Sequence, residues 1–235
     1  MLERRGIVRV RGVIALACAF LAGGVSVAAA LGPDEVLRFF TWTASGAPPP
    51  DPFLANGVAT GSDVAIYTAA GTGPSALNTL APADGAARFI DYAALAKVVP
   101  GFAPSDADKA KGALPPGVTL TEAQGLNAML RVQENLAATG LTLADVTFMR
   151  IYLDNPEGAA RADYAGWNRA YRKFMANVDL TTGLPIPAYA PVIFQTKTRP
   201  ARSNIEVATL PALGWLIEIE VVAAYPRDRA TWTRE

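Results

Sequence analysis

The sequence that decides the fold lies near the C-terminal end and reads RPARSNIEVATLP over residues 199–211, followed by IEIEVVA over residues 217–223. We expect two consecutive strands here, over residues 203–210 and 214–224. In a strand, successive side chains point to opposite faces. The paired glutamates of the second strand, two residues apart, therefore share one face.

Two longer helices are expected upstream of these strands. Residues 119–139 carry apolar side chains at helical spacing, with Thr121 as the expected cap and Gly140 as the end. Residues 156–177 form the second helix, with an aromatic stripe along one side. A shorter helix is expected over residues 86–99, ending at a proline.

Strands alternate with these helices. Residues 53–71 read as two short strands separated by Gly61-Ser62-Asp63, and residues 146–153 read as another strand. In that strand we expect Val146, Phe148 and Arg150 to face one way. The order β-β-α-β-α-β-β predicts an α+β domain, with two helices packed on one face of a mixed sheet. The other face needs cover, which favours assembly with copies of the same chain.

Composition excludes several kinds of chemistry. The 235 residues are 51% hydrophobic and 18% charged, so a folded core is expected. There is no histidine, which excludes a Ser-His-Asp triad and histidine-based zinc sites. The single cysteine, Cys18, lies in an apolar N-terminal run. Chemistry must come from carboxylates, Arg, Lys, hydroxyls, amides and backbone groups, and we expect neither a metal nor a cofactor.

The N-terminus resembles an export signal. Four arginines precede an uncharged run over residues 12–33, with small residues near Ala30. This layout predicts a signal peptide over residues 1–30 and an exported, periplasmic or secreted protein without stable membrane insertion after cleavage. Arg4-Arg5 also resembles a twin-arginine signal. A retained membrane anchor is the alternative, because the run is nearly long enough to span a bilayer.

The expected mature chain is slightly acidic. Removing residues 1–30 takes away four arginines and one glutamate, leaving 17 basic and 20 acidic residues. This balance argues against nucleic acid as a partner. The remaining segments are an N-terminal lead-in over residues 31–51, a domain over residues 52–225 with an insertion at about 74–118, and a tail over residues 226–235.

Several motifs occur together in the order of one known family. The chain resembles the RidA (YjgF-like) reactive-intermediate imine/enamine deaminase family, as an exported member with long insertions. The motifs that carry the resemblance are Pro200-Ala201-Arg202-Ser203, Ile217-Glu218-Ile219-Glu220, Asn168-x-x-Tyr171-x-x-Phe174, Tyr67-Thr68 to Gly71, Gln124 to Gly140, and Asp145-Val146 to Asp154.

The resemblance implies both a fold and an activity. It implies a chorismate-mutase-like (RidA-like) α+β subunit that forms a homotrimer with clefts between subunits. Arg202, followed by Ser203, would hold the carboxylate of a small 2-imino or 2-enamino acid. Glu218 would help hold a water. The products would be a 2-keto acid and ammonia, made without a cofactor.

Two positions depart from the family pattern. The family's Gly-Pro-Tyr is replaced by Asp51-Pro52-Phe53, so Phe53 lacks a hydroxyl that would face a ligand. The serine before the strand-end glycine is replaced by Ala70, or by Ala69 in a shifted register. Thr72 or Ser75 could supply a hydroxyl instead.

Alternatives remain for both the site and the function. Physically, Arg202 suits a carboxylate, because a guanidinium presents two parallel donors. The competing interpretation is a structural ion pair with Glu206, Glu218 or Glu220. Besides a deaminase, the chain could be a non-catalytic trimeric module that binds small carboxylates. A ribonuclease, an activity attached to some relatives, is the third possibility.

Overall fold

A computed structural model describes residues 31–40 and 51–226. The signal peptide predicted over residues 1–30, part of the lead-in and nearly all of the tail lie outside the described residues. In the described ranges, no helix combines the length and the apolar character that crossing a membrane requires.

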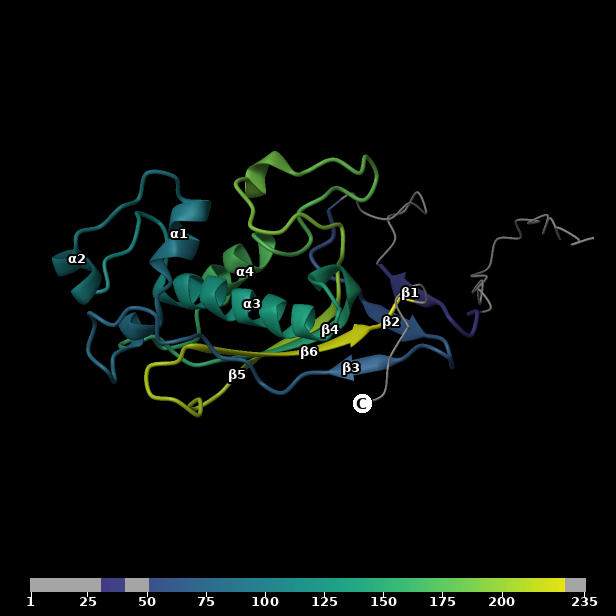
Figure 1. The fold of residues 1–235 in the computed structure, drawn as a ribbon, viewed down its shortest axis with the longest axis horizontal. Helices are drawn as coiled ribbons and strands as arrows, with labels where there is room; N and C mark the ends of the chain where they lie inside the picture. Colours follow the sequence, from purple (N-terminus) through teal and green to yellow (C-terminus); the bar gives the residue numbers. More distant parts are fainter. Residues whose placement is uncertain (1–30, 41–50, 227–235) are drawn as a thin grey trace, which may run out of the picture. The chain divides into compact units, whose positions relative to one another are not determined.

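The domain is built on a four-stranded mixed sheet with the order β3-β6-β4-β5 (Figure 1). The strands are β3 (Ile66–Thr68), β6 (Ile217–Ala224), β4 (Val146–Leu153) and β5 (Ala201–Glu206). β6 runs antiparallel to both of its neighbours, whereas β4 and β5 are parallel. The predicted mixed sheet is therefore confirmed, although both C-terminal strands are shorter than expected.

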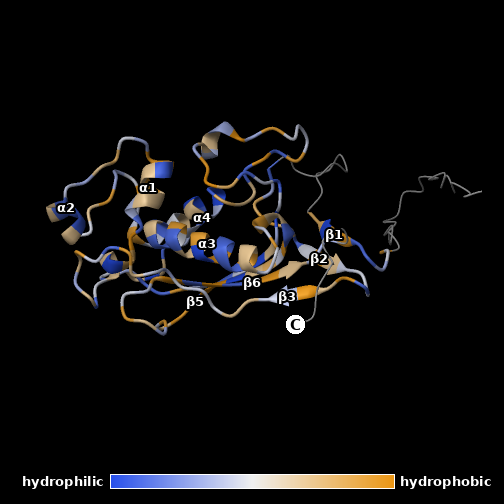
Figure 2. Ribbon diagram, viewed as in Figure 1, coloured by the Kyte–Doolittle hydropathy of each residue, from blue (hydrophilic) through white to orange (hydrophobic). Residues whose placement is uncertain are grey.

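Two helices, α3 (Leu120–Ala138) and α4 (Tyr164–Arg172), cover one face of this sheet (Figure 1). Figure 2 shows polar and apolar residues alternating along α3, with apolar residues prominent on β6. The apolar side of α3 is fully buried at Leu126, Met129 and Leu136. This arrangement confirms the predicted α+β fold with two helices on one face.

The start of α3 differs from the expectation. Thr119, rather than Thr121, is its cap, and its hydroxyl accepts a hydrogen bond from the Glu122 amide at 3.2 Å. Thr121 lies inside the helix, completely buried. The predicted end is correct, because Gly140 follows the helix with φ of +76°, a conformation that glycine adopts easily.

The second helix is much shorter than the predicted range of 156–177. Asp163 caps α4 by accepting a hydrogen bond from the Gly166 amide at 2.8 Å, so the helix begins only at Tyr164. A turn containing Gly158, with φ of +74°, precedes it. The aromatic stripe is confirmed where it falls inside or next to the helix, since Trp167 and Phe174 are fully buried.

The segment predicted as an insertion is folded and anchored to α3. The helix expected over 86–99 is two pieces, a 3₁₀ turn (Ala86–Phe89) and α1 (Tyr92–Val98), because Asp91 caps a new helix between them. A further short helix, α2 (Asp106–Ala110), was not predicted.

The side-chain amides of two buried residues of α3 form hydrogen bonds with this segment. The Gln124 amide donates to the carbonyls of Ala86 and Gly214, and the Asn127 amide donates to the carbonyls of Ser75 and Phe89. Buried amides need such partners. The segment is therefore part of the same core rather than a separate appendage.

A second, two-stranded sheet joins the lead-in to the domain. β1 (Val36–Phe39) pairs antiparallel with β2 (Gly57–Thr60). β2 and β3 confirm the two strands expected over 53–71. β1 was not predicted, and it shows that the lead-in contains regular structure.

The strand register assigns side chains to the two faces of the main sheet. Met149 lies beside Arg202 on β5 and beside Val221 on β6, and all three face the helices. Tyr152 lies beside Glu218 and faces the opposite side, the open face. The expected orientation of Val146 was wrong, because a bulge between Val146 and Phe148 turns Val146 into the core.

The open face carries no helix in the described part of the chain (Figure 1). Its edge strands leave Ile66 45% exposed and Ile205 39% exposed. Phe148 and Val222, neighbours on β4 and β6, add partly buried apolar surface. Such a surface is consistent with the sequence-based expectation that copies of the chain cover it.

The fully buried Leu126 tests the core assignment. We expect Leu126→Ala to lower the free energy of unfolding by about 2–5 kcal/mol, because it removes buried apolar volume and leaves a cavity. Leu213→Ala is the matched control, since Leu213 is 77% exposed. Its effect should stay within about 0.5 kcal/mol. Urea unfolding measures both, and equal losses would contradict the assignment.

Candidate functional site

Arg202 of β5 lies in an aromatic setting beneath α4. Its guanidinium carbon is 4.5 Å from the ring centroids of both Phe53 and Tyr171, and 5.9 Å from that of Trp167. Its Nη2 donates to the Oδ1 of Asn168 at 3.0 Å. Ring faces attract a cation but do not neutralise it. The arrangement holds the guanidinium in place while leaving its charge uncompensated.

The ion-pair interpretation of Arg202 is wrong for the described residues. Glu220 pairs with Arg150 on the open face at 2.9 Å, and Glu206 accepts a hydrogen bond from the Ala162 amide at 3.1 Å. Glu218 lies on the other side of the sheet from Arg202. The Nη1 of Arg202 is buried and has no hydrogen-bond partner in this part of the chain. Such an unmet donor is unusual in a buried charged group and points to a missing partner.

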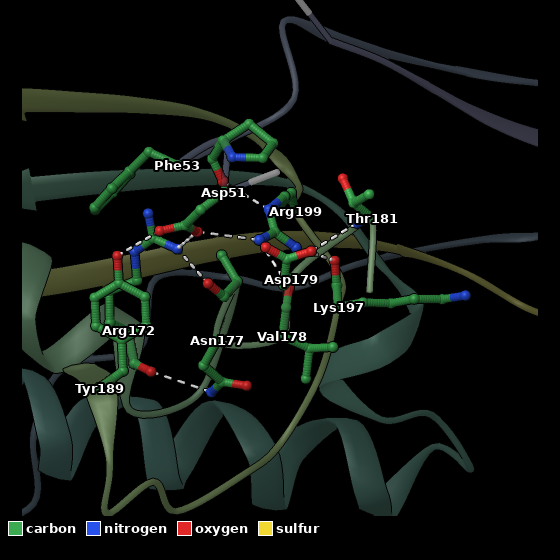
Figure 3. Close-up of polar contacts among 12 residues, drawn as sticks. Asp51, Phe53, Arg172, Asn177, Val178, Asp179, Thr181, Tyr189, Lys197 and Arg199 are labelled. Atoms are coloured by element: carbon green, nitrogen blue, oxygen red, sulfur yellow. Dashed lines mark hydrogen bonds and ion pairs between the residues drawn. The ribbon is translucent and has the colours of Figure 1, made fainter. Parts of the chain in front are cut away.

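A carboxylate network beside Arg202 was not predicted (Figure 3). The Oδ1 of Asp51 accepts from Arg172 at 2.6 Å and from Arg199 at 3.2 Å. Its Oδ2 accepts from the Tyr189 hydroxyl at 2.6 Å. Arg172 also lies 4.4 Å from the ring centroids of both Phe53 and Tyr189. Phe53 thus contacts two guanidinium groups, Arg172 and Arg202.

The local charges are unequal. Arg199 is fully buried, Arg172 is 6% exposed, and these two guanidiniums share the single carboxylate of Asp51. Arg199 also donates to the carbonyls of Pro52 and Lys197, at 2.6 and 2.7 Å. The third guanidinium, Arg202, has no acid. The cluster therefore has excess positive charge and favours an anion.

Burial shifts the protonation of the groups around Arg202. Loss of hydration lowers the pKa of Arg202 to about 10, and the nearby Arg172 lowers it as well, while Tyr171 acts in the opposite direction. Burial raises the pKa of the Tyr171 hydroxyl to about 12. At neutral pH the site thus presents a cationic guanidinium beside a neutral phenol.

Apart from Phe53, the other predicted site residues lie away from the Arg202 guanidinium. Glu218 and Ser203 are on the open face, whereas Arg202 faces the helices. Glu218 packs against Gly71, where an added Cβ would overlap its carboxylate. Thr72 is next to Gly71, is bridged to Ile219, and its buried hydroxyl accepts from the Asn135 amide at 3.3 Å.

Two separate half-sites result. Phe53, with Arg202, forms one half. Ala70 and Glu218 belong to the other, on the strand that continues β3 and its neighbour β6, whereas Thr72 faces α3 together with its paired residue Ile219. The structure therefore does not bring Arg202 and Glu218 together within one subunit. Burial raises the pKa of Glu218, and the charge of Glu220 raises it further.

Sequence reasoning missed the most connected residues of the first half-site. Asn168, which appeared only as part of a motif, accepts the hydrogen bond that holds Arg202. No sequence pattern marked Arg172 or Arg199 as site residues. At position 51 the one indication was an aspartate where the family has a glycine. No group of three or more His, Cys, Asp or Glu side chains suited to a metal ion is found in residues 31–40 and 51–226.

Comparison with protein families identifies the class of protein. The model of the Endoribonuclease L-PSP family matches residues 98–225, more than half of the chain. The chain therefore belongs to this family, whose YjgF/Rid-type members are the ones that the motifs around Arg202 resemble.

Solved structures give similarities at low identity. A YjgF-family protein from Neisseria meningitidis is 17% identical, with 82% of this chain and 96% of that chain covered and a TM-score of 0.35. A YjgF/YER057c/UK114-family protein from Mycobacterium tuberculosis is 19% identical, covering 81% and 100%, with a TM-score of 0.35. A Rid-family protein of unknown function from Yersinia pestis is 20% identical, covering 80% and 98%, with a TM-score of 0.41. No curated protein matches the chain.

Asp51→Asn tests the shared carboxylate. Removing this charge leaves the buried Arg172 and Arg199 without a carboxylate within ion-pair distance in the described residues, so we expect the free energy of unfolding to fall by about 3–5 kcal/mol. Asp106→Asn is the matched control, because Asp106 is 79% exposed in its pair with Lys109. It should cost less than about 1 kcal/mol. Chemical denaturation distinguishes the two, and a loss below 1 kcal/mol for Asp51→Asn would contradict the network.

Glu218→Gln tests the raised pKa of Glu218. Because the folded-state pKa lies above the ordinary 4.5, the contribution of Glu218 to stability is full below that value and declines as the pH rises through the folded-state pKa. The variant lacks this decline. Its stability relative to the parent chain should therefore increase as the pH rises above 4.5.

Urea unfolding at several pH values measures this difference. Glu157→Gln, in an exposed turn, is the control, and its difference from the parent should stay constant. A pH-independent difference for Glu218→Gln would contradict the raised pKa.

Proposed function

We propose that this protein binds small 2-imino acids through Arg202 and hydrolyses them to 2-keto acids and ammonia. The observation that carries the proposal is the guanidinium of Arg202, which has no acidic partner among the described residues and retains a buried donor without an acceptor. A substrate carboxylate would supply both the charge and the acceptor.

The aromatic surroundings favour this use of Arg202. Desolvation makes the cation costly, as its lowered pKa indicates. Phe53 and Tyr171 offset part of that cost, and an incoming carboxylate would offset more. Fixing the carboxylate also fixes the position of the adjacent imine carbon.

The reaction needs little beyond a positioned water. The water oxygen bonds to the imine carbon while the nitrogen takes a proton, which gives a carbinolamine. The hydroxyl proton then passes to the amino nitrogen, the C–N bond breaks, and the keto group forms as ammonia leaves. A carboxylate with a raised pKa suits both proton transfers near neutral pH.

We propose that Glu218 of the partner subunit supplies this carboxylate in a homotrimer. Glu218 of the same subunit lies on the opposite face of the sheet from Arg202, so it cannot approach a substrate held there. β5 is an edge strand of the sheet, so we expect a neighbouring copy that packs along this edge to bring its Glu218 toward Arg202. The family resemblance and the partly apolar open face support this arrangement.

A non-catalytic binding module is the second candidate. Phe53 has no hydroxyl, and its ring lies against the guanidinium of Arg202. Ala70 likewise lacks the hydroxyl that the family pattern supplies. These departures leave carboxylate binding intact but remove polar groups that could assist hydrolysis.

We also propose a location and a class of partner for the protein. The basic and then apolar pattern of residues 1–30 supports export to the periplasm or beyond, and the slightly acidic remainder supports a small-molecule partner rather than nucleic acid. A periplasmic substrate would then be an imine released outside the cytoplasm.

Arg202→Ala tests the function. With 2-iminobutanoate generated in the assay, we expect the parent chain to accelerate keto-acid release and Arg202→Ala to lower kcat/KM by roughly 100-fold, the loss of a charge-assisted carboxylate contact. Arg161→Ala, at an exposed arginine, should leave the rate unchanged. Calorimetry with 2-oxobutanoate should show binding that Arg202→Ala abolishes.

The outcomes separate the two candidates. Binding that depends on Arg202 without turnover in the parent chain favours the non-catalytic module. Turnover that survives in Arg202→Ala contradicts both.

A further inference from the structure

We propose that a cavity over α4 is a second anion site, which binds a small carboxylic acid separately from Arg202. The α4 cavity has a volume of about 270 Å³ and lies between the end of α4 and the segment that carries Tyr189. Its charged and aromatic walls include Phe53, Glu122, Arg169, Arg172, Lys173 and Tyr189.

The charge of the α4 cavity is positive. Arg169 pairs with Glu122 at 2.7 Å, and Arg172 pairs with Asp51 at 2.6 Å. Lys173 has no carboxylate within ion-pair distance in the described part of the chain. Its Nζ donates to the backbone carbonyl of Tyr189 at 2.9 Å, which satisfies one of three donors. One ammonium charge therefore remains uncompensated at the wall.

Burial makes that charge costly. Loss of hydration lowers the pKa of Lys173, and the nearby Glu122 offsets only part of this effect. An anion beside Nζ would recover the lost hydration energy. The carboxylate of Glu122, whose pKa burial raises, already accepts a hydrogen bond from Arg169 at 2.7 Å.

Arg172 adds a second cation to the wall of the α4 cavity. Its guanidinium lies between the rings of Phe53 and Tyr189, 4.4 Å from each centroid, and pairs with Asp51 (Figure 3). Its Nε has no hydrogen-bond partner among residues 31–40 and 51–226, but this atom has almost no accessible surface. Arg172 therefore contributes positive charge, whereas the donors open to a ligand are those of Lys173.

The size and lining of the α4 cavity define the ligand class. A volume of about 270 Å³ is just below the usual range for drug-sized ligands, about 300–1,000 Å³. The rings of Phe53 and Tyr189 and the methyl of Ala188 give apolar contact. We therefore infer a small carboxylic acid with a short apolar or aromatic tail, such as benzoate.

This site is distinct from Arg202. Arg202 does not line the α4 cavity, whereas Phe53 and Asn168, which both contact its guanidinium, do. The two sites share these two side chains as a common wall, but each uses a different cation. Binding at the α4 cavity does not depend on the proposed deaminase activity.

Calorimetry of the full chain with benzoate tests the proposal. We expect Lys173→Met to weaken benzoate binding by at least about tenfold, the loss of one charge-assisted contact. Ala188→Trp should weaken it similarly by filling the α4 cavity from an exposed position, and it decides the test if Lys173→Met fails to fold. Lys97→Met, at an exposed lysine of α1, is the matched control and should bind like the parent chain.

Arg202→Ala separates this proposal from the proposed function. Benzoate binding should persist in Arg202→Ala, even if that variant has lost turnover of 2-iminobutanoate. Benzoate binding that disappears in Arg202→Ala and survives in both cavity variants would overturn the second site. Absence of benzoate binding to the parent chain, or binding of inorganic phosphate alone at Lys173, would also overturn it.

Discussion

The single carboxylate of Asp51 determines how charge is distributed around the candidate site. Both of its oxygens are occupied, by Arg172 and Arg199 on one side and by the Tyr189 hydroxyl on the other. Within residues 31–40 and 51–226 no carboxylate pairs with Arg202, which is held by ring faces and an amide instead. The anion-attracting character of Arg202 is thus a property of the network beside it, and not of Arg202 alone.

The pleat of the sheet imposes the second constraint. Side chains alternate between faces, and the register of β4 with β5 and β6 sends Arg202 toward the helices and Glu218 toward the open face. No change of rotamer can bring these two side chains together across a strand. Any chemistry that uses both groups must therefore involve two copies of the chain.

Much of the architecture could be predicted because it depends on local pattern. Leu126, Met129 and Leu136 recur at helical spacing, and the core of the domain forms where they predict it. Ends of elements were less predictable, since Thr119 and Thr121 are equally good caps in sequence. Tertiary packing selected Thr119 by burying Thr121. The bulge at Val146 also escaped prediction, because it depends on the partner strand.

The candidate site could be predicted only in part. Arg202 and Glu218 were found through motifs, each of which is local in sequence. Asp51, however, lies 121 residues from Arg172 and 148 from Arg199. No spacing rule connects residues so far apart, and only the fold brings them into contact. The hydrogen bond between Lys173 and the Tyr189 carbonyl was equally unpredictable, because it forms only where the irregular segment that carries Tyr189 packs against the end of α4.

The hydrogen bonds of the Gln124 and Asn127 side chains have a consequence for deletions in this chain. These two side-chain amides of α3 donate hydrogen bonds to the backbone carbonyls of residues 75, 86, 89 and 214. Three of these carbonyls belong to the long segment after β3, so hydrogen bonds join that segment to α3. Excising that segment alone would leave the buried amide of Asn127 without its two acceptors, whereas Gln124 would keep its hydrogen bonds to Gly214 and Leu216. A deletion of this segment would therefore have to be accompanied by a substitution of Asn127.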